Sequence, residues 1–380
     1  MLTRAALTAF MLIGPIAAAQ DAAAPPATVE SAPADLRDIL EPIRLKAGLP
    51  ALAGVIFSDH AVLARGVCGV RSLGDPTPAE LTDLWHLGSC SKAMTATLIA
   101  TMVDRGELSW DDKLPDLLPE FATEIDAGYS EVPLRQLLTM TAGVPTDLSP
   151  DGLWDRLWKH KGTPTSARAV LTRSVLAKPP VHTPGSKSLY SNASFAIAGH
   201  IAEVRAGVAF EQLITDRLFT PLGITTAGFG APGAAGRVDQ PRGHDSHDKP
   251  KSPGPESDNP EAITPAGRVH MSMDDWAKFL MLHLRESDVP PVSTKSMAEL
   301  HRPSLNSYAM GWAVAERPWG GTVLTHSGSN TMWFCVTWLS PGKKFGVAVA
   351  TNTASHDAPK AADEAAWALI RQHIEGARAK

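Results

Sequence analysis

A serine and a lysine three residues apart have the types and spacing to do chemistry together. Ser89 and Lys92 frame Ser-Cys-Ser-Lys, and an apolar stretch with helical character follows at 91–105. Residues i and i+3 share one helix face, so the Lys92 amine can reach the Ser89 hydroxyl. A helix N-terminus favours a developing alkoxide, and a lysine deprotonated by burial can act as a base. The same spacing at Ser246 and Lys249 lies in a Pro-rich stretch with no helix after it, so we interpret it as a chance match.

A second motif, Tyr190-Ser191-Asn192, could complete such a site. A phenol near a cationic lysine loses its proton more easily and can relay protons. The Asn192 amide could hold the lysine or a substrate amide by hydrogen bonds. The alternative is a turn in which Asn192 caps a helix that begins near Ser194.

A third motif, His326-Ser327-Gly328, lies next to a strand-like stretch. Gly328 would let a substrate backbone approach closely, because glycine has no side chain. The backbone N–H of Ser329 could pair with that of Ser89 to form an oxyanion hole. The alternative is a hairpin turn with a histidine on the surface.

The hydrophobic pattern predicts the elements that must position these motifs. Strand-like runs occupy both ends of the chain, at 51–57, 61–67, 309–315, 331–339 and 345–351, with terminal helices at 35–47 and 359–375. Helical patterns fill the middle at 91–105, 195–206, 209–218 and 273–284, and a long surface loop is expected at 237–260. The expected fold is α/β of the α+β type. An antiparallel sheet (about 35–85 and 305–378) is flanked by the terminal helices and carries a large, mainly helical insertion (about 86–304).

The order of the three motifs resembles that of the β-lactamase-related serine hydrolases. This family includes class C β-lactamases, D,D-carboxypeptidases, D-aminopeptidases and certain esterases, and S-x-x-K is its serine motif. Here Y-x-N follows S-x-x-K by about a hundred residues, and H-x-G comes near the C-terminal strands. Further segments are similar to the family at 108–112, 118–120, 137–144, 219–224, 265–267, 310–312 and 350–352, with Met140 and Ala142 standing where His and Ser are usual.

The resemblance implies a β-lactamase/transpeptidase-like fold and a two-step acyl transfer through a covalent acyl-enzyme. Ser89 would attack a carbonyl while Lys92 or Tyr190 takes its proton, and the sequence leaves open which of the two is the base. The amides of Ser89 and Ser329 would stabilise the oxyanion, and Tyr190 would protonate the leaving group. Asn192 would orient Lys92 and the substrate.

His326, expected beside the far end of the substrate, departs from most β-lactamases and D,D-peptidases, which carry the lysine of K-T-G there. Histidine is largely neutral near pH 7, so the attraction for a carboxylate-bearing β-lactam is weakened. We therefore expect an esterase, amidase or D-aminopeptidase-like enzyme acting on a small-molecule ester or amide or on a short peptide. The alternatives are a β-lactamase or D,D-carboxypeptidase and, since a fold does not guarantee activity, a non-catalytic cell-wall or penicillin-binding protein.

The beginning of the chain predicts export. Arg4 precedes an apolar run that ends in Ala17-Ala18-Ala19, which is typical of a secretory signal peptide over 1–19. An Ala/Pro-rich linker is expected over 20–34, and the hydrolase domain over 35–378. The mature protein is expected to be periplasmic or secreted, without stable membrane insertion after cleavage; an uncleaved anchor is the alternative.

Composition argues against other kinds of partner. The formal net charge is −5 and no Lys/Arg block is present, which gives no support for a nucleic-acid partner. The cysteines, Cys68, Cys90 and Cys335, are odd in number and widely spaced, so we interpret them as small buried hydrophobes. His244 and His247 lie in a Pro/Gly-rich loop without the fixed scaffold of a zinc site, so no metal or other cofactor is expected. The oligomeric state is not specified.

Overall fold

The computed structural model describes residues 32–286 and 290–378. The predicted signal peptide, and nearly all of the predicted linker, lie outside the described residues. Among the described helices, none combines the length and the apolar character needed to cross a bilayer.

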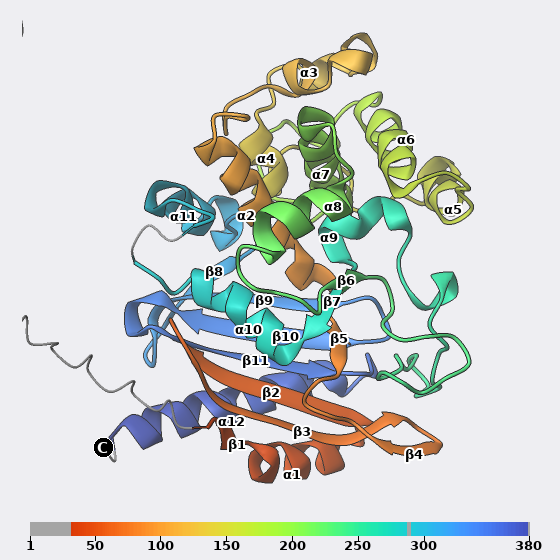
Figure 1. The fold of residues 1–380 in the computed structure, drawn as a ribbon. Helices are drawn as coiled ribbons and strands as arrows, with labels where there is room; N and C mark the ends of the chain where they lie inside the picture. Colours follow the sequence, from red (N-terminus) through yellow and green to blue (C-terminus); the bar gives the residue numbers. More distant parts are fainter. Residues whose placement is uncertain (1–31, 287–289, 379–380) are drawn as a thin grey trace, which may run out of the picture. The chain divides into compact units, whose positions relative to one another are not determined.

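The main sheet is formed by both ends of the chain (Figure 1). Its eight strands include the path β1-β3-β2-β11-β10-β9-β8, with β4 paired to β3, and only the β1–β3 pair is parallel. The strands are β1 (Ala34–Asp35), β2 (Ala51–Ser58), β3 (Val62–Ser72), β4 (Asp75–Pro78), β8 (Ala313–Arg317), β9 (Gly321–Ser329), β10 (Phe334–Ser340) and β11 (Phe345–Thr351). The mixed α/β class predicted from the sequence is therefore confirmed.

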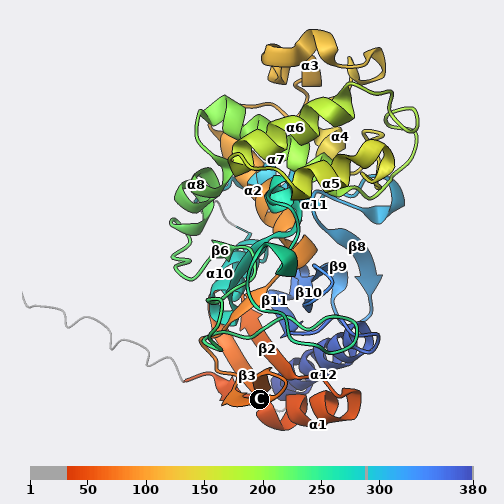
Figure 2. The same cartoon turned by 90° about the vertical axis from the view of Figure 1, so that its right-hand side faces the viewer.

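The terminal helices α1 (Arg37–Ala47) and α12 (Ala358–Arg378) pack on one face of this sheet (Figures 1 and 2). Their apolar sides meet Leu52 and Val349 of the central strands in a core of their own. α12 presents mainly alanines to the sheet, and small side chains allow a helix to lie close to a pleated surface. Gly48 ends α1 in the left-handed conformation, as C-terminal glycines commonly do.

The opposite face of the sheet carries the helical region, with α2 at its centre (Figure 1). Every residue of α2 from Ser91 to Met102 is buried, as expected for a helix that is apolar all round. A 3₁₀ turn, η1, leads into it. The bounds are η1 (Gly88–Cys90), α2 (Ser91–Asp104), α3 (Leu114–Leu117), α4 (Leu134–Leu138), α5 (Leu153–Trp158), α6 (Pro164–Leu176), α7 (Asn192–Ala206), α8 (Phe210–Ile214), α9 (Thr264–Gly267), α10 (Met273–Leu282) and α11 (Thr294–His301).

Two features of this region differ from the sequence-based expectation. A small antiparallel sheet joins the main sheet to the helical region. It has the order β5-β7-β6 and is formed by β5 (Leu84–His86), β6 (Gly228–Phe229) and β7 (Val269–Ser272). The segment 237–260, expected to be a surface loop, is anchored by fully buried His244. The His244 ring accepts a hydrogen bond from the Leu73 amide and contacts the carbonyl oxygen of Asn352. The polar composition of 237–260 alone did not reveal that the His244 side chain is buried.

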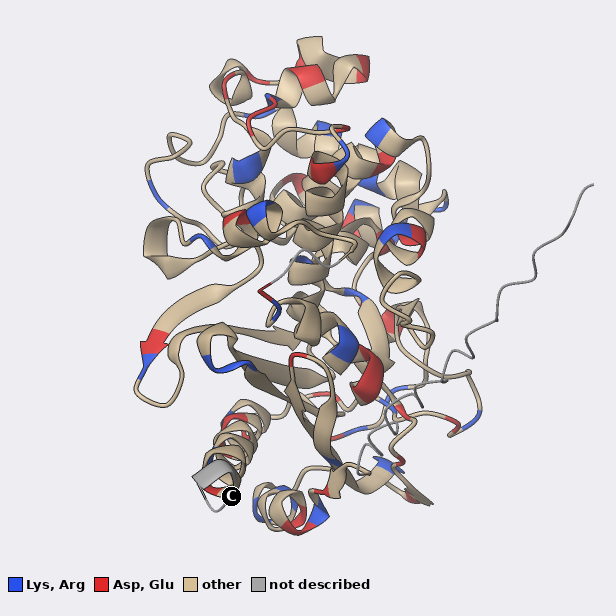
Figure 3. Ribbon diagram, turned by 60° about the vertical axis from the view of Figure 1, so that its left-hand side comes forward, with Lys and Arg blue, Asp and Glu red and all other residues tan. Residues whose placement is uncertain are grey.

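Lys and Arg residues are interspersed with Asp and Glu residues along the described elements (Figure 3). Ion pairs such as Arg135–Asp111 and Lys46–Glu364 join neighbouring elements at the surface. The four side chains of these two pairs are 33% to 73% exposed, so each pair contributes only about 0–1 kcal/mol to stability.

Candidate active site

Ser89 lies in the turn η1, between strand β5 and the buried helix α2. Strand β9 lies directly against this turn because both contacting positions are glycines. A Cβ atom at Gly88 would lie 2.3 Å from the Ser329 nitrogen, and one at Gly328 would lie 2.0 Å from the Leu87 carbonyl oxygen. Gly88 also has a positive φ of 46°, which favours glycine. Gly328 therefore admits the turn that carries Ser89; because it also lines a cavity beside Ser89, the close approach of a substrate backbone stays a prediction.

Lys92 lies in the first turn of α2 with its side chain fully buried. Its Nζ lies 2.9 Å from Ser89 Oγ, 2.8 Å from Asn192 Oδ1 and 2.8 Å from the Ala266 carbonyl oxygen. Asn192 is free to hold the lysine because Ser191, one residue earlier, caps α7. The alternative in which Asn192 is the cap is therefore wrong.

Tyr190 approaches Ser89 from the other side. Its phenol donates a 2.7 Å hydrogen bond to Ser89 Oγ. Burial lowers the pKa of Lys92 to about 7, whereas partial removal from water raises the pKa of Tyr190 to about 12. Near neutral pH a large share of Lys92 is thus unprotonated while Tyr190 keeps its proton. This arrangement suits a base at Lys92 and an acid at Tyr190.

His326 lies inside β9, so the alternative of a surface histidine on a hairpin turn is wrong. The ring is 9% exposed, and its Nδ1 lies 2.6 Å from the carbonyl oxygen of Ser327. Because a carbonyl only accepts, Nδ1 carries a proton, and in the neutral ring Nε2 accepts from the Tyr308 phenol at 3.2 Å. Sequence analysis assigned no role to Tyr308. Its only signals were that the chain has just three tyrosines and that Tyr308 stands just before the 310–312 segment.

A cavity of about 610 Å³ opens in front of Ser89, within the usual range for small-molecule sites. Strand β8 pairs with β9 only as far as Thr325, so the edge of β9 beyond it borders the cavity. The described lining residues include one carboxylate and no lysine or arginine. They are Ser89, Tyr190, Tyr308, Ala313, Thr325, His326, Ser327, Gly328, Ser329, Phe334, Val336, Trp338, Pro359 and Asp363.

A family model described as Beta-lactamase matches residues 32–372 of the chain. The chain belongs to the Beta-lactamase family. Members of this family are serine hydrolases. The resemblance inferred from the three motifs is thus confirmed at the level of the family.

Curated relatives of this Beta-lactamase-family chain include penicillin-binding proteins. Penicillin-binding protein 4 of Amycolatopsis lactamdurans is 27% identical over 325 residues, which is 82% of each chain. Protein flp of Staphylococcus aureus (strain N315) is 22% identical over 339 residues, covering 85% of this chain but 63% of the relative.

Solved structures share the fold. The octameric penicillin-binding protein homologue from Pyrococcus abyssi has a TM-score of 0.72 at 24% identity, covering 89% of this chain and 77% of the other. The D-alanine carboxypeptidase AmpC from Burkholderia cenocepacia has a TM-score of 0.71 at 21% identity, covering 89% and 97%.

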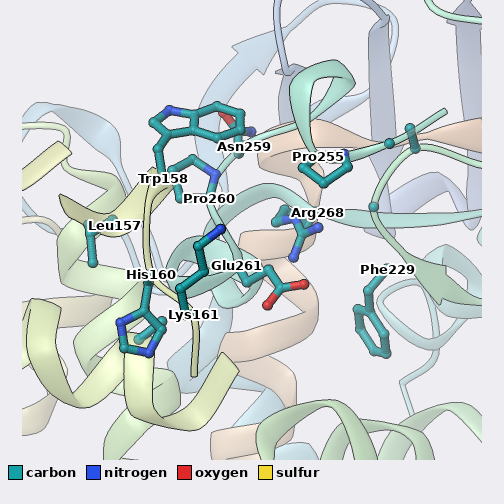
Figure 4. Close-up of a pocket in the computed structure, with 14 residues that line it drawn as sticks. Leu157, Trp158, His160, Lys161, Phe229, Pro255, Asn259, Pro260, Glu261 and Arg268 are labelled. Carbon is teal, nitrogen blue, oxygen red and sulfur yellow. The ribbon is translucent and has the colours of Figure 1, made fainter. Parts of the chain in front are cut away.

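A second cavity, of about 420 Å³, lies between the end of α5, strand β6 and the segment before α9 (Figure 4). Trp158, Lys161, Glu261 and Arg268 are among its walls, and it shares no lining residue with the cavity at Ser89. The motifs of the Beta-lactamase family did not predict it.

The remaining sequence-based candidates lie away from this centre or beneath it. Ser246 and Lys249 are exposed in the 237–260 segment. All three cysteines are reduced and buried, and the Sγ atoms of Cys90 and Cys335 lie 3.6 Å apart beneath η1. Within residues 32–286 and 290–378, no group of three or more His, Cys, Asp or Glu side chains is arranged to hold a metal ion.

Proposed function

We propose that this protein is a hydrolase that forms an acyl-enzyme at Ser89 on small ester or amide substrates. One observation carries the proposal: Ser89 Oγ lies between the Lys92 amine at 2.9 Å and the Tyr190 phenol at 2.7 Å, facing the 610 Å³ cavity. A hydroxyl within hydrogen-bond reach of a base and an acid has the geometry of an activated nucleophile.

Acylation begins with the neutral Lys92 amine. As Ser89 Oγ bonds to the substrate carbonyl carbon, its proton moves to Lys92 Nζ, and the carbonyl electrons move onto the oxygen. The backbone N–H groups of Ser89 and Ser329 receive this oxyanion. Asn192 Oδ1 and the Ala266 carbonyl accept hydrogen bonds from the new ammonium, which offsets the cost of a buried charge.

Collapse of the tetrahedral intermediate breaks the bond to the leaving group. Tyr190 gives its proton to the departing oxygen or nitrogen and is reprotonated by the proton that Lys92 took from Ser89. In deacylation a water molecule attacks the ester carbonyl and gives its proton to the neutral Lys92 amine. The proton returns to Ser89 Oγ as the acid product leaves.

The charges around the cavity favour substrates without a carboxylate at the His326 end. The two His326 ring nitrogens are already engaged by the Tyr308 phenol and the Ser327 carbonyl, so neither is free to bind a substrate carboxylate. Asp363 adds a negative charge to the wall. A β-lactam, whose carboxylate is usually met by a cation, would therefore be a poor substrate.

The test is turnover of a short-chain p-nitrophenyl ester, with a chromogenic cephalosporin in parallel. Ser89→Ala should abolish ester turnover, whereas Ser246→Ala, at another Ser-x-x-Lys sequence, should not change it. Little cleavage of the cephalosporin is expected. Absence of ester turnover in the wild type, together with absence of covalent labelling of Ser89 by a fluorophosphonate, would contradict the proposal and favour a binding protein.

We also propose that the protein is exported, on the signal-like pattern of 1–19. N-terminal sequencing of the protein from a periplasmic or culture-medium fraction should find a chain that begins at Gln20. An intact N-terminus in the cytoplasmic fraction would contradict this.

A further inference from the structure

Behind the turn that carries Ser89 lies a buried carboxylate, Asp258, whose side chain is 1% exposed. Its Oδ1 lies 2.9 Å from His86 Nε2 and accepts a 3.1 Å hydrogen bond from Asn330 Nδ2. Its Oδ2 accepts a 3.1 Å hydrogen bond from Arg268 Nε. Burial opposes ionisation of Asp258, yet its contacts with His86 and Arg268 bring its pKa below the usual value. The carboxylate therefore stays charged at neutral pH.

Each partner of Asp258 is next to a part of the proposed site. His86 ends β5 three residues before Ser89, and Asn330 directly follows Ser329. Arg268 follows α9, whose Ala266 carbonyl holds the lysine, and it also forms a wall of the second cavity (Figure 4). One side chain thus contacts three separate segments that surround the nucleophile.

The contact through His86 reaches the backbone of the nucleophile turn. The Gly88 N–H donates a 3.1 Å hydrogen bond to His86 Nδ1, so Nδ1 carries no proton and Nε2 carries one, facing Asp258. The ring stacks on Trp333, with centroids 5.4 Å apart. The imidazole is thereby held in one orientation and one tautomer.

The contact through Asn330 reaches the other backbone amide. While Nδ2 of Asn330 binds Asp258, its Oδ1 accepts hydrogen bonds from the amides of Met332 and Trp333 at 3.1 and 3.2 Å. The turn between β9 and β10 is therefore tied to the same carboxylate as the turn before α2.

We infer that Asp258 is a positioning residue for the oxyanion hole: by holding His86 and Asn330 together, it sets the spacing of the Ser89 and Ser329 amides. The inference rests on the proposed function. Two N–H groups stabilise an oxyanion only when both lie about 2.7–3.1 Å from it, and a shift of about 1 Å can reduce the rate by about 100-fold.

A second buried carboxylate in this chain provides a matched control. Glu203 in α7 is 2% exposed and, like Asp258, lies between an arginine and a histidine. It accepts hydrogen bonds from Arg168 at 2.7 Å and contacts His200 Nδ1 at 2.8 Å. Its partners contact no residue of the Ser89 cavity lining, so loss of its charge tests stability alone.

The experiment compares Asp258→Asn and Asp258→Ala with Glu203→Gln in the mature protein. The measurements are thermal unfolding, steady-state hydrolysis of the p-nitrophenyl ester, and the rate of Ser89 labelling by a fluorophosphonate. For Asp258→Ala we expect kcat and the labelling rate to fall by about 100-fold with KM changed less than about 3-fold, because the oxyanion forms after binding. Asp258→Asn, which keeps one acceptor, should lose less.

Glu203→Gln should lower the unfolding temperature but keep kcat within about 3-fold of the wild type. Equal kcat losses in the Asp258 and Glu203 variants would overturn the inference and make Asp258 a member of a structural ion pair only.

If Asp258→Ala does not fold, Asn330→Ala removes one of the two contacts and should still lower kcat without raising KM. Unchanged kcat in Asn330→Ala would also overturn the inference. A wild type that neither turns over the ester nor is labelled would instead refute the proposed function, and with it any role for this oxyanion hole.

Discussion

The chain contains the spacing Ser-x-x-Lys three times, and two of these sequences lie in very different settings. Ser89 and Lys92 begin a buried helix, and the Lys92 amine meets three oxygen atoms. Ser246 and Lys249 lie in an exposed stretch, where the Ser246 hydroxyl contacts the neighbouring His247 ring at 3.4 Å. Spacing alone therefore does not make a nucleophile. Removal from water lowers the pKa of Lys92, and fixed partners then hold it against the serine.

The largest difference in activity between these two Ser-x-x-Lys sequences is expected when the lysine of each is replaced. Lys92→Ala should lower kcat/KM for the p-nitrophenyl ester by about 1,000-fold or more, because the base of the acylation step is lost. Lys249→Ala should leave kcat/KM unchanged. Steady-state kinetics of the two purified variants check this, and similar losses in both would remove the distinction between the two sequences.

The next effect concerns pH. If the unprotonated Lys92 amine is the base, kcat/KM for a neutral ester is low below pH 7, rises through about 7 and then levels off. Tyr190, with a pKa raised to about 12, keeps its proton across this range. A pH–rate profile from pH 5.5 to 9 checks the sign. A profile that falls through pH 7 would assign the base role elsewhere.

Variants of Asn192 test how much the hydrogen-bond partners of Lys92 contribute to catalysis. Asn192→Leu removes an acceptor at 2.8 Å from the ammonium and should lower kcat by about 10- to 100-fold. Because that acceptor favours the charged lysine, its loss should also move the rising limb of the pH profile to lower pH. Asn192→Asp places a negative charge there and should move the limb to higher pH. Shifts in the same direction would contradict this account.

The smallest effect is expected at His326. His326→Lys adds a cation to a cavity whose described lining has no lysine or arginine, and should raise cephalosporin cleavage by about tenfold. His326→Gln, which adds no charge, serves as the control and should not. Equal cephalosporin turnover in both variants would show that charge at this position does not select the substrate.

Sequence predicted those parts of the molecule that carry periodic patterns or spaced motifs. Strand β11 and helix α12 follow clear apolar periods, and Ser89, Tyr190 and Asn192 were found from motifs that the fold brings together around Lys92. The strands β5, β6 and β7 are two to four residues long, which is too short to show a period.

Asp258 and Tyr308 escaped prediction for a different reason. Each acts through partners that are distant in the chain: 72 residues separate Asp258 from Asn330, and 18 separate Tyr308 from His326. Their local sequences resemble those of solvent-exposed segments. Only the folded chain brings these polar groups together and buries them.

The pairing of β2 with β11 has a consequence for how this protein folds. The Ala51 amide donates to the Asn352 side chain across 301 positions of sequence. Contacts of such long range form slowly, because the ends of a long loop must meet before any stabilisation is gained. Strand β9, which carries Ser329, also comes near the end of the chain. On the proposed mechanism, Ser89 can therefore become reactive only after the C-terminal strands have been synthesised and have paired, so completion of the sheet would also complete the site.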